Sequence, residues 1–591
     1  MAEEASSFLK RRFNLPNLRE GVYILRTLPF WEKCLFLFFL VIFFISSVLL
    51  GWQANNRFLV VVPERGGLLE EGIIGAPRFI NPLISISDAE RDLSELVYSG
   101  LMRTDNSGGL ITDLAEKYDV SPDGLVYTFT LKPNLVWQDG ERVTTDDIVF
   151  TIQRAKDPQI KSTKRASWEG VGIEKVNDLT IKFNIKNPYS PFLENTTLGI
   201  LPKHIWQNIP SEQMLYSEFN TRPIGSGPYK IDTITKDPSG NVSSYDLSPN
   251  DQFALGKPYL KKITLKFYLS EKDAVDAYKR GNISSIGGIS PAMIDSVFPG
   301  CANGTQCESG SNKTKVINLP RIFAVFFNQN KSKVLLQKEV RQALLTATDK
   351  NKLVQEVLKG YGETLNHPIP QGTLGALGLE PENFSADDAK KILIKNGWKL
   401  NQNGVFEKEL SKKEKLTLEF SVSTSGESEE LKSIATLIKK MWEQAGAKVE
   451  LKFFETGDLQ KAITERNYDS LLFGESIGRD PDPFVFWHSS QKNYPGSNVA
   501  MYANAKVDKL LEDARKTLNQ DERIAKYKQF QQEVEKDTPA VFLFSPSFIY
   551  ILPSNIQGAD NIESVAVPAE RFSQIYKWYT QTNKVWRIFA K

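Results

Sequence analysis

Hydrophobic positions along the chain follow two different periods. Residues 127–131 (YTFTL) alternate between apolar and polar side chains, which predicts a half-buried strand. Residues 387–397 space their apolar positions as an amphipathic helix does. After residue 416, predicted strands alternate with predicted helices, and this order favours a mostly parallel α/β unit. The strands are expected at 416–421, 449–454, 469–474 and 539–544, and the helices at 430–445, 458–465, 508–517 and 522–536.

A turn-and-cap pattern lies at residues 137–150 (WQDGERVTTDDIVF). A predicted strand ends at Trp137 and meets an Asp-Gly turn. Thr144 or Thr145 is then expected to cap a helix, because two aspartates occupy the first turn and an apolar face follows. These residues alone predict a hairpin followed by a capped helix.

Residues 34–52 (CLFLFFLVIFFISSVLLGW) contain no charged side chain. As a helix they span roughly 28 Å, close to the thickness of a bilayer core. Six basic residues precede the run: Lys10, Arg11, Arg12, Arg19, Arg26 and Lys33. The positive-inside rule therefore places residues 1–33 in the cytoplasm and the main body outside it. We expect an uncleaved single-pass anchor; a cleaved signal peptide is the alternative, although no small-x-small cleavage site follows the run.

Charge and length narrow the function classes. The 591 residues suffice for several domains, and 73 basic against 71 acidic residues leave a net charge of +2. This balance argues against a general nucleic-acid binder, which needs a concentrated basic surface. Cys301 and Cys307 lie in a loop rich in Gly, Asn and Ser. Outside the cytoplasm they could form a disulfide, with two free thiols as the alternative; no histidine is near enough in sequence to complete a zinc site.

Several sequence blocks occur in one order over residues 70–545. They are W-x-D-G-E-x-x-T-x-x-D-x-x-F at 137–150, LPKH at 201–204, P-x-G-x-G-P-Y at 223–229, and FN at 327–328 followed by VRQAL at 340–344. In this order the chain resembles the family 5 extracellular solute-binding proteins, the peptide, nickel and oligosaccharide receptors of ABC importers.

The resemblance implies an α/β fold with two lobes, of the periplasmic-binding-protein type (type II, cluster C-like), with an inserted subdomain and one transmembrane helix before it. Lobe I is expected to combine 58–100, 223–320 and 541–591, with 101–222 as the subdomain and 321–540 as lobe II. Two crossing strands, near 319–328 and 538–544, would form the hinge.

The predicted strand 469–474 ends in a loop at 477–483, and ligands bind at such strand ends in open α/β sheets. The family has an Asp-Pro loop here that lines the cleft. The expected ligand-binding residues are Tyr98, Asn328, Glu475, Arg479, Asp480, Asp482 and Trp487. Asp480 and Asp482 could instead only form turns. Dipeptide receptors carry an acid before Asp-Pro for the ligand ammonium; here only Glu475 is near, and Arg479 could hold a carboxylate.

The resemblance implies an extracytoplasmic, membrane-anchored receptor, expected to be a monomer, that delivers a small ligand, a peptide by preference, to ABC permease subunits. No cofactor, metal or nucleic acid is expected. A ligand sensor that uses the same fold without transport is one alternative. A secreted serine hydrolase is another, because 474–478 (GESIG) match G-x-S-x-G around Ser476. The prolines that follow are poor material for the helix this motif requires.

Overall fold

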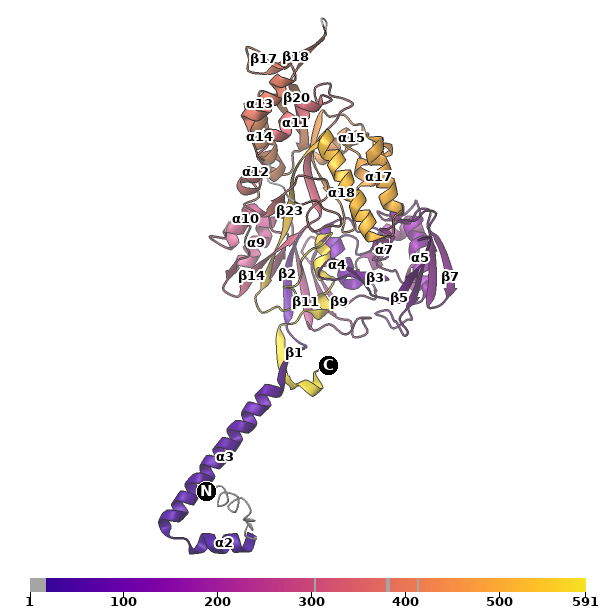
Figure 1. Cartoon of the computed structure of the whole chain (residues 1–591). Helices are drawn as coiled ribbons and strands as arrows, with labels where there is room; N and C mark the ends of the chain where they lie inside the picture. The colour runs from indigo at the N-terminus through magenta and orange to yellow at the C-terminus, as the bar shows by residue number, and fades with distance from the viewer. Residues whose placement is uncertain (1–17, 302–303, 379–382, 412–413, 591) are drawn as a thin grey trace, which may run out of the picture. The chain divides into compact units, whose positions relative to one another are not determined.

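The computed structural model describes residues 18–301, 304–378, 383–411 and 414–590. The chain divides into two compact units, a small one of residues 1–64 with 582–591 and a large one of residues 65–581. Each unit is described separately below, with the element labels of Figure 1.

The small unit contains α2 (Leu18–Thr27), α3 (Phe30–Phe58), β1 (Leu59–Glu64), most of β24 (Gln581–Trp586) and η6 (Arg587–Phe589). The α3 helix is 29 residues long, buries no residue, and is long and apolar enough to cross a membrane. It extends beyond the predicted run of 34–52 at both ends. β1 follows α3 directly and pairs with β24, a strand that the sequence did not indicate.

The large unit is built on a mixed sheet of thirteen described strands. Ten of them follow the order β21-β20-β22-β15-β23-β12-β2-β11-β10-β9, and β13, β14 and β16 pair beside this path. Their bounds are β2 (Leu68–Ile74), β9 (Tyr229–Lys236), β10 (Val242–Pro249), β11 (Lys262–Tyr268), β12 (Ser285–Gly287), β13 (Glu308–Ser309), β14 (Asn312–Asn318), β15 (Arg321–Phe327), β16 (Gly362–Thr364), β20 (Glu419–Ser425), β21 (Lys448–Phe454), β22 (Ser470–Ser476) and β23 (Ala540–Pro553).

One long strand, β23, connects the two halves of this sheet (Figure 1). Its first half pairs with β15 and its second half with β14, antiparallel in both cases. β14 and β15 are consecutive, with only Leu319 and Pro320 between them. The chain therefore passes between the halves at two adjacent places, 319–320 and 545–547. The sequence placed one crossing close to this position but ended the other strand at residue 544, well short of Pro553.

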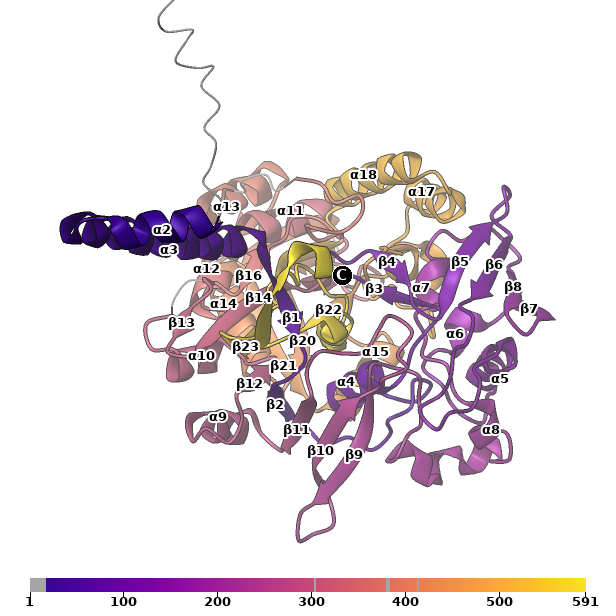
Figure 2. The ribbon, with the colours of Figure 1, turned by 90° about the horizontal axis from the view of Figure 1, so that it is seen from below.

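A separate four-stranded antiparallel sheet has the order β5-β6-β8-β7, and Figure 2 shows α5 near it. Its elements are β5 (Ala115–Val120), β6 (Val126–Leu131), β7 (Gly172–Asn177), β8 (Thr180–Asn184) and α5 (Thr145–Lys156). Thr144 caps α5 through a capping box with Asp147, which confirms one of the two expected caps. The predicted strand before it is wrong: only an isolated bridge joins Val136 to Arg142.

The remaining elements surround these sheets. They are α4 (Asp88–Val97), β3 (Met102–Thr104), β4 (Leu110–Thr112), α6 (Arg165–Trp168), α7 (Phe192–Asn195), α8 (Lys203–Trp206), η1 (Ser211–Tyr216), η2 (Glu218–Asn220), α9 (Glu271–Lys279), α10 (Pro291–Val297), α11 (Lys338–Thr346), α12 (Lys350–Glu356), α13 (Ala386–Lys395), β17 (Lys399–Leu400), β18 (Phe406–Ser411), β19 (Glu414–Thr417), α14 (Glu429–Gln444), α15 (Thr456–Thr464), α16 (Phe484–Trp487), η3 (Ser489–Gln491), α17 (Ala505–Lys516), α18 (Gln520–Asp537), η4 (Pro568–Phe572) and η5 (Ile575–Lys577). Cys301 and Cys307 are joined by a disulfide with their Cα atoms 6.0 Å apart.

Two expectations for the second half of the chain need correction. β20 is parallel to β21 and β22, but β15 is antiparallel to both β22 and β23, so the unit is mixed rather than mostly parallel. The predicted strand 416–421 is also divided between β19 and β20, because the chain changes sheets at Leu418. Its amide still donates to Phe406 of β18, whereas its carbonyl oxygen accepts the amide of Lys448 in β21.

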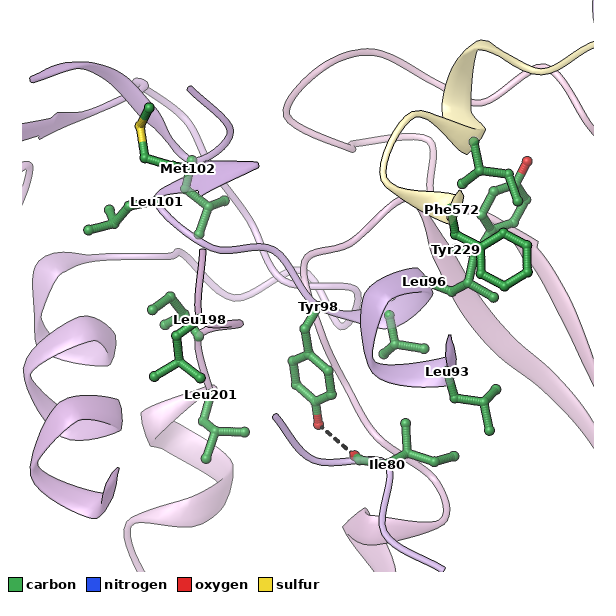
Figure 3. Close-up of a cluster of buried hydrophobic side chains, with 14 of the residues drawn as sticks. Ile80, Leu93, Leu96, Tyr98, Leu101, Met102, Leu198, Leu201, Tyr229 and Phe572 are labelled. Atoms are coloured by element: carbon green, nitrogen blue, oxygen red, sulfur yellow. Dashed lines mark hydrogen bonds between the residues drawn. The ribbon is translucent and has the colours of Figure 1, made fainter. Parts of the chain in front are cut away.

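The P-x-G-x-G-P-Y motif packs against the end of α4. The amide of Gly227 donates to the carbonyl oxygen of Val97 at 2.8 Å. A Cβ at Gly227 would lie 2.5 Å from the Val97 carbonyl carbon, so only glycine permits this approach. Tyr98 follows in a buried hydrophobic cluster, and its hydroxyl donates to the Ile80 carbonyl oxygen at 3.4 Å (Figure 3).

Candidate functional site

A cavity of about 480 Å³ is lined by residues of α4, β3, the segments 163–168 and 194–199, the start of β15, the end of β22 and η4. Its lining includes Arg321 and Ser476, which are opposite each other at the end of the β15–β22 ladder. The other lining side chains that carry charge or can stack on a ligand include Glu95, Tyr98, Lys164, Trp168, Glu194 and Glu570. Residues far apart in the sequence thus line one cavity.

Arg479 connects these parts. It leaves the loop after β22 and forms ion pairs with Glu194, at 3.3 Å, and with Glu570. Glu570 also accepts the Ala566 amide at 2.7 Å. The arginine predicted to hold a ligand carboxylate is therefore already held by two glutamates, one from the subdomain and one from η4. A ligand carboxylate would have to displace one of them.

Burial raises the pKa values of two acids in the cavity lining. Burial raises the pKa of Glu194 to about 7, although the charge of Arg479 lowers it. The pKa of Glu95 is likewise raised to about 7 by burial, against the opposing charge of Arg103. Arg103 pairs with Glu95 at 3.0 Å and with Asp113 at 2.8 Å. Two arginines thus serve four acids, since Arg103 pairs with Glu95 and Asp113 and Arg479 pairs with Glu194 and Glu570.

Two further cations line the cavity. Lys164 and Arg321 form no ion pair within the part of the chain that the structure describes. Desolvation by the surrounding atoms lowers the pKa of Lys164, and Arg91 lowers it further while Glu570 raises it, although the residue is exposed to solvent. Glu95, Asp113, Glu194 and Glu570 share Arg103 and Arg479, so Lys164 and Arg321 bring the formal charge of these eight groups to zero. They are the two of the eight that form no ion pair with a described residue.

The two aspartates of the Asp-Pro loop have partners on the neighbouring helices. Asp480 pairs with Arg523 at 2.9 Å, and burial raises the pKa of Asp480. Asp482 receives two hydrogen bonds from Arg515, at 2.8 and 2.5 Å, and a third from Tyr189. These contacts hold the loop onto α17, α18 and the subdomain, and a ligand role for either aspartate stays a prediction.

Three other predicted residues are buried and do not line the cavity. Trp487 is fully buried and packs on the Phe542 ring, with centroids 5.7 Å apart. Asn328 donates to the Arg466 carbonyl oxygen at 3.0 Å. Glu475 is 4% exposed, and burial raises its pKa well above the ordinary value. Of the predicted set, only Tyr98 lines the cavity itself.

Arg479 was among the predicted residues, but its partners Glu194 and Glu570 and the cations Lys164 and Arg321 were not found by sequence reasoning. Arg479 lies 285 positions from Glu194 and 91 from Glu570 along the chain, and no local motif indicates either ion pair. Arg321 had a weak signal, because it begins the strand that ends in the FN block.

Residues 109–498 match the family model described as bacterial extracellular solute-binding proteins, family 5. Among curated relatives, the oligopeptide-binding protein AppA of Bacillus subtilis is 29% identical over 511 residues, which cover 84% of this chain and 89% of the relative. The probable D,D-dipeptide-binding periplasmic protein DdpA of Escherichia coli is 25% identical, covering 83% and 91%.

Solved structures agree with the sequence comparisons. The AppA structure from Bacillus subtilis, in complex with a nonapeptide, superposes with a TM-score of 0.68 at 27% identity, covering 88% of this chain and 99% of that one. NikZ from Campylobacter jejuni, in complex with Ni(L-His), gives a TM-score of 0.69 at 27% identity, covering 87% and 99%. The fold is thus the two-lobed α/β fold of periplasmic binding proteins, as the sequence predicted.

Proposed function

The chain belongs to the bacterial extracellular solute-binding proteins of family 5, and from this we propose that it is an extracytoplasmic receptor which binds a peptide between two lobes and delivers it to an ABC importer. In this proposal α3 is an uncleaved anchor, the N-terminus is cytoplasmic, and the receptor acts as a monomer without altering its ligand. The lobes and subdomain of this proposal keep the bounds predicted above, except that 58–64 and 582–591 belong to the small unit.

The observation that carries the peptide proposal is a pair of cations in the cavity lining. Four acids of the site are held in ion pairs by Arg103 and Arg479, whereas Lys164 and Arg321 form no ion pair with a described residue. A ligand with a free carboxylate would pair with them, because a carboxylate accepts charge-assisted hydrogen bonds from both cation types. Trp168 and Tyr98 provide apolar wall for the rest of a peptide.

Arg479 supports closure of the lobes around that peptide. Its loop follows β22, while Glu194 and Glu570 come from the other side of the cavity. These pairs join the two sides of the cavity, so they favour a closed arrangement that a bound peptide would stabilise further. An anchor in α3 would keep the receptor near its permease at a raised effective concentration.

The test uses the full chain in lipid nanodiscs and a peptide library. Mass spectrometry of co-purified ligand first identifies a candidate, and calorimetry then compares that peptide with its C-terminal amide. Arg321→Gln and Lys164→Gln are each expected to weaken binding of the free acid by about 10-fold or more, which is the worth of one charge-assisted hydrogen bond. Lys236→Gln, at an exposed position of β9, is the matched control.

Equal affinity for the acid and the amide would contradict the role of the two cations, and a lack of any bound peptide would contradict the receptor itself. Uptake of labelled peptide by cells that carry the chain and its permease separates import from sensing. Ser476→Ala with an esterase assay tests the hydrolase alternative. Ser476 ends β22, and α16 starts only at Phe484, so the strand-turn-helix geometry of a nucleophile elbow does not follow it.

A further inference from the structure

The C-terminal segment of the small unit, residues 584–590, exposes large apolar side chains beside cations. Trp586, Ile588 and Phe589 are 46%, 78% and 72% exposed. Lys584 and Arg587 are also exposed, and neither forms an ion pair with any described residue. Such a concentration of exposed apolar surface is typical of an interaction site.

This segment lies against the C-terminal end of α3. The indole nitrogen of Trp586 donates to the side-chain oxygen of Asn55 at 2.9 Å. The Trp586 ring stacks on Phe58, with centroids 6.3 Å apart and planes inclined by 25°. β24, which ends at Trp586, pairs with β1, the strand that continues α3. The segment is therefore fixed at one height along the helix.

That height follows from the geometry of the helix. Trp52 ends the apolar run, and Asn55 lies about 4.5 Å farther along the axis. The headgroup layer on each side of a bilayer is about 5–7 Å thick. With the apolar run across the hydrocarbon core, Asn55 and the Trp586 indole bonded to it lie within the outer headgroup layer. Tryptophan is enriched at this depth, because its ring is apolar and its N–H is polar.

On the premise that α3 is the membrane anchor of the proposed function, we propose that segment 584–590 is a second membrane contact, seated in the outer lipid headgroup layer beside α3. Ile588 and Phe589 enter the boundary of the acyl chains. Lys584 and Arg587 remain at the surface, where lipid phosphates neutralise them. The partner is the lipid itself, because Trp586 is held at headgroup depth by Asn55 and its neighbours Ile588 and Phe589 are large apolar side chains that no described residue covers.

The experiment uses the full chain in phosphatidylcholine vesicles, in a Cys34→Ser background that leaves the Cys301–Cys307 disulfide intact. A single Ile588→Cys carries an environment-sensitive NBD dye. Blue-shifted emission, quenched when some lipids carry a headgroup nitroxide, is expected. Thr582→Cys is the matched control: it lies on the same strand about 13 Å from Trp586 along the chain and should report water. Adding Trp586→Ser to the Ile588→Cys variant should remove much of the shift, because the segment then loses its hold on Asn55.

Emission at Ile588→Cys equal to that at Thr582→Cys would overturn the inference. So would a blue shift without nitroxide quenching, because the segment would then be covered by protein, a second copy included. An alkaline carbonate wash separates the premise from the inference. Release of the chain from the vesicles removes the anchor and the inference with it, whereas retention with a water-like dye overturns only the second contact.

Discussion

The hydroxyl of Ser545 donates to the main-chain oxygen of Leu319 at 2.6 Å, which ties together the two segments where the chain crosses between the halves of the large sheet. Ser545 is 6% exposed, so water does not replace this bond. Leu319 also accepts the Arg321 amide at 2.8 Å. Removing the hydroxyl therefore breaks one hydrogen bond, and the Leu319 carbonyl oxygen keeps its bond from the Arg321 amide.

Ser545→Ala is expected to lower the free energy of opening at the crossing by about 1 kcal/mol, the net worth of a buried hydrogen bond. Hydrogen exchange of peptides that cover both crossing segments measures this opening. Ser547→Ala is the control, because that hydroxyl is on the same strand and has no described hydrogen-bond partner. Equal exchange in the two variants would show that the bond does not couple the segments.

The approach of Gly227 to Val97 predicts a larger effect. A Cβ there would meet backbone atoms of Val97 and Tyr98 at 2.5 and 2.7 Å, and backbone cannot move aside as a flexible side chain can. Gly227→Ala is expected to cost about 3 kcal/mol, at the upper end of overpacking penalties. Its melting temperature is compared with that of Gly457→Ala, whose Cβ would meet nothing within 4 Å. An unchanged melting temperature in Gly227→Ala would mean that the motif is not tightly packed.

Local chemistry made some of the fold predictable. The start of α5 was predictable because Thr144 can cap a helix and two acids follow it. The bounds of α14 were predicted to within one residue, because its apolar pattern and the glycine that ends it, Gly446, are both local signals. The two-lobed plan came from the order of sequence blocks. By contrast, β24 is held by pairing with β1, more than 500 positions away, and nothing in its own residues marks it as a strand.

The site was less predictable for the same reason. The Asp-Pro loop was placed correctly at the end of β22, but its aspartates face Arg515 and Arg523, which sequence reasoning did not pair with them. Trp487, expected to bind the ligand, is in the core because its helix turns that face toward Phe542. Which face of a short helix is buried depends on tertiary packing, and four residues are too few to show a period.

The Asp482–Arg515 pair predicts how this loop responds to mutation. Asp482→Asn leaves the Arg515 guanidinium half-buried without its anion, so a loss of about 1–3 kcal/mol is expected. Thermal unfolding checks this against Asp251→Asn, which removes a surface pair with Lys257 and should lower the melting temperature much less. Peptide affinity of the folded variant is a separate readout: the ligand role predicted for Asp482 requires that affinity falls as well. A melting temperature equal to that of Asp251→Asn would contradict the structural role of the pair.

Burial of Glu194 and Glu95 predicts a pH dependence of stability. The pKa of each is raised from 4.5 to about 7, so between these values the folded chain binds protons that the unfolded chain has released. Stability from this source is fully present below about pH 4.5 and is lost as the pH rises through 7. These two groups are therefore expected to lower the melting temperature of the full chain in nanodiscs as the pH rises through this window.

Glu194→Gln isolates that part, since a glutamine occupies the same space but does not titrate. The difference in melting temperature between wild type and Glu194→Gln should shift in favour of the variant as the pH rises from about 4.5 to 7, and level off above it. Glu212→Gln, at an exposed position of η1, should show no such shift. A difference that moves in favour of wild type over the same window would mean that Arg479 stabilises the Glu194 carboxylate more than burial penalises it, and that the pair across the cavity is strengthened as the pH rises.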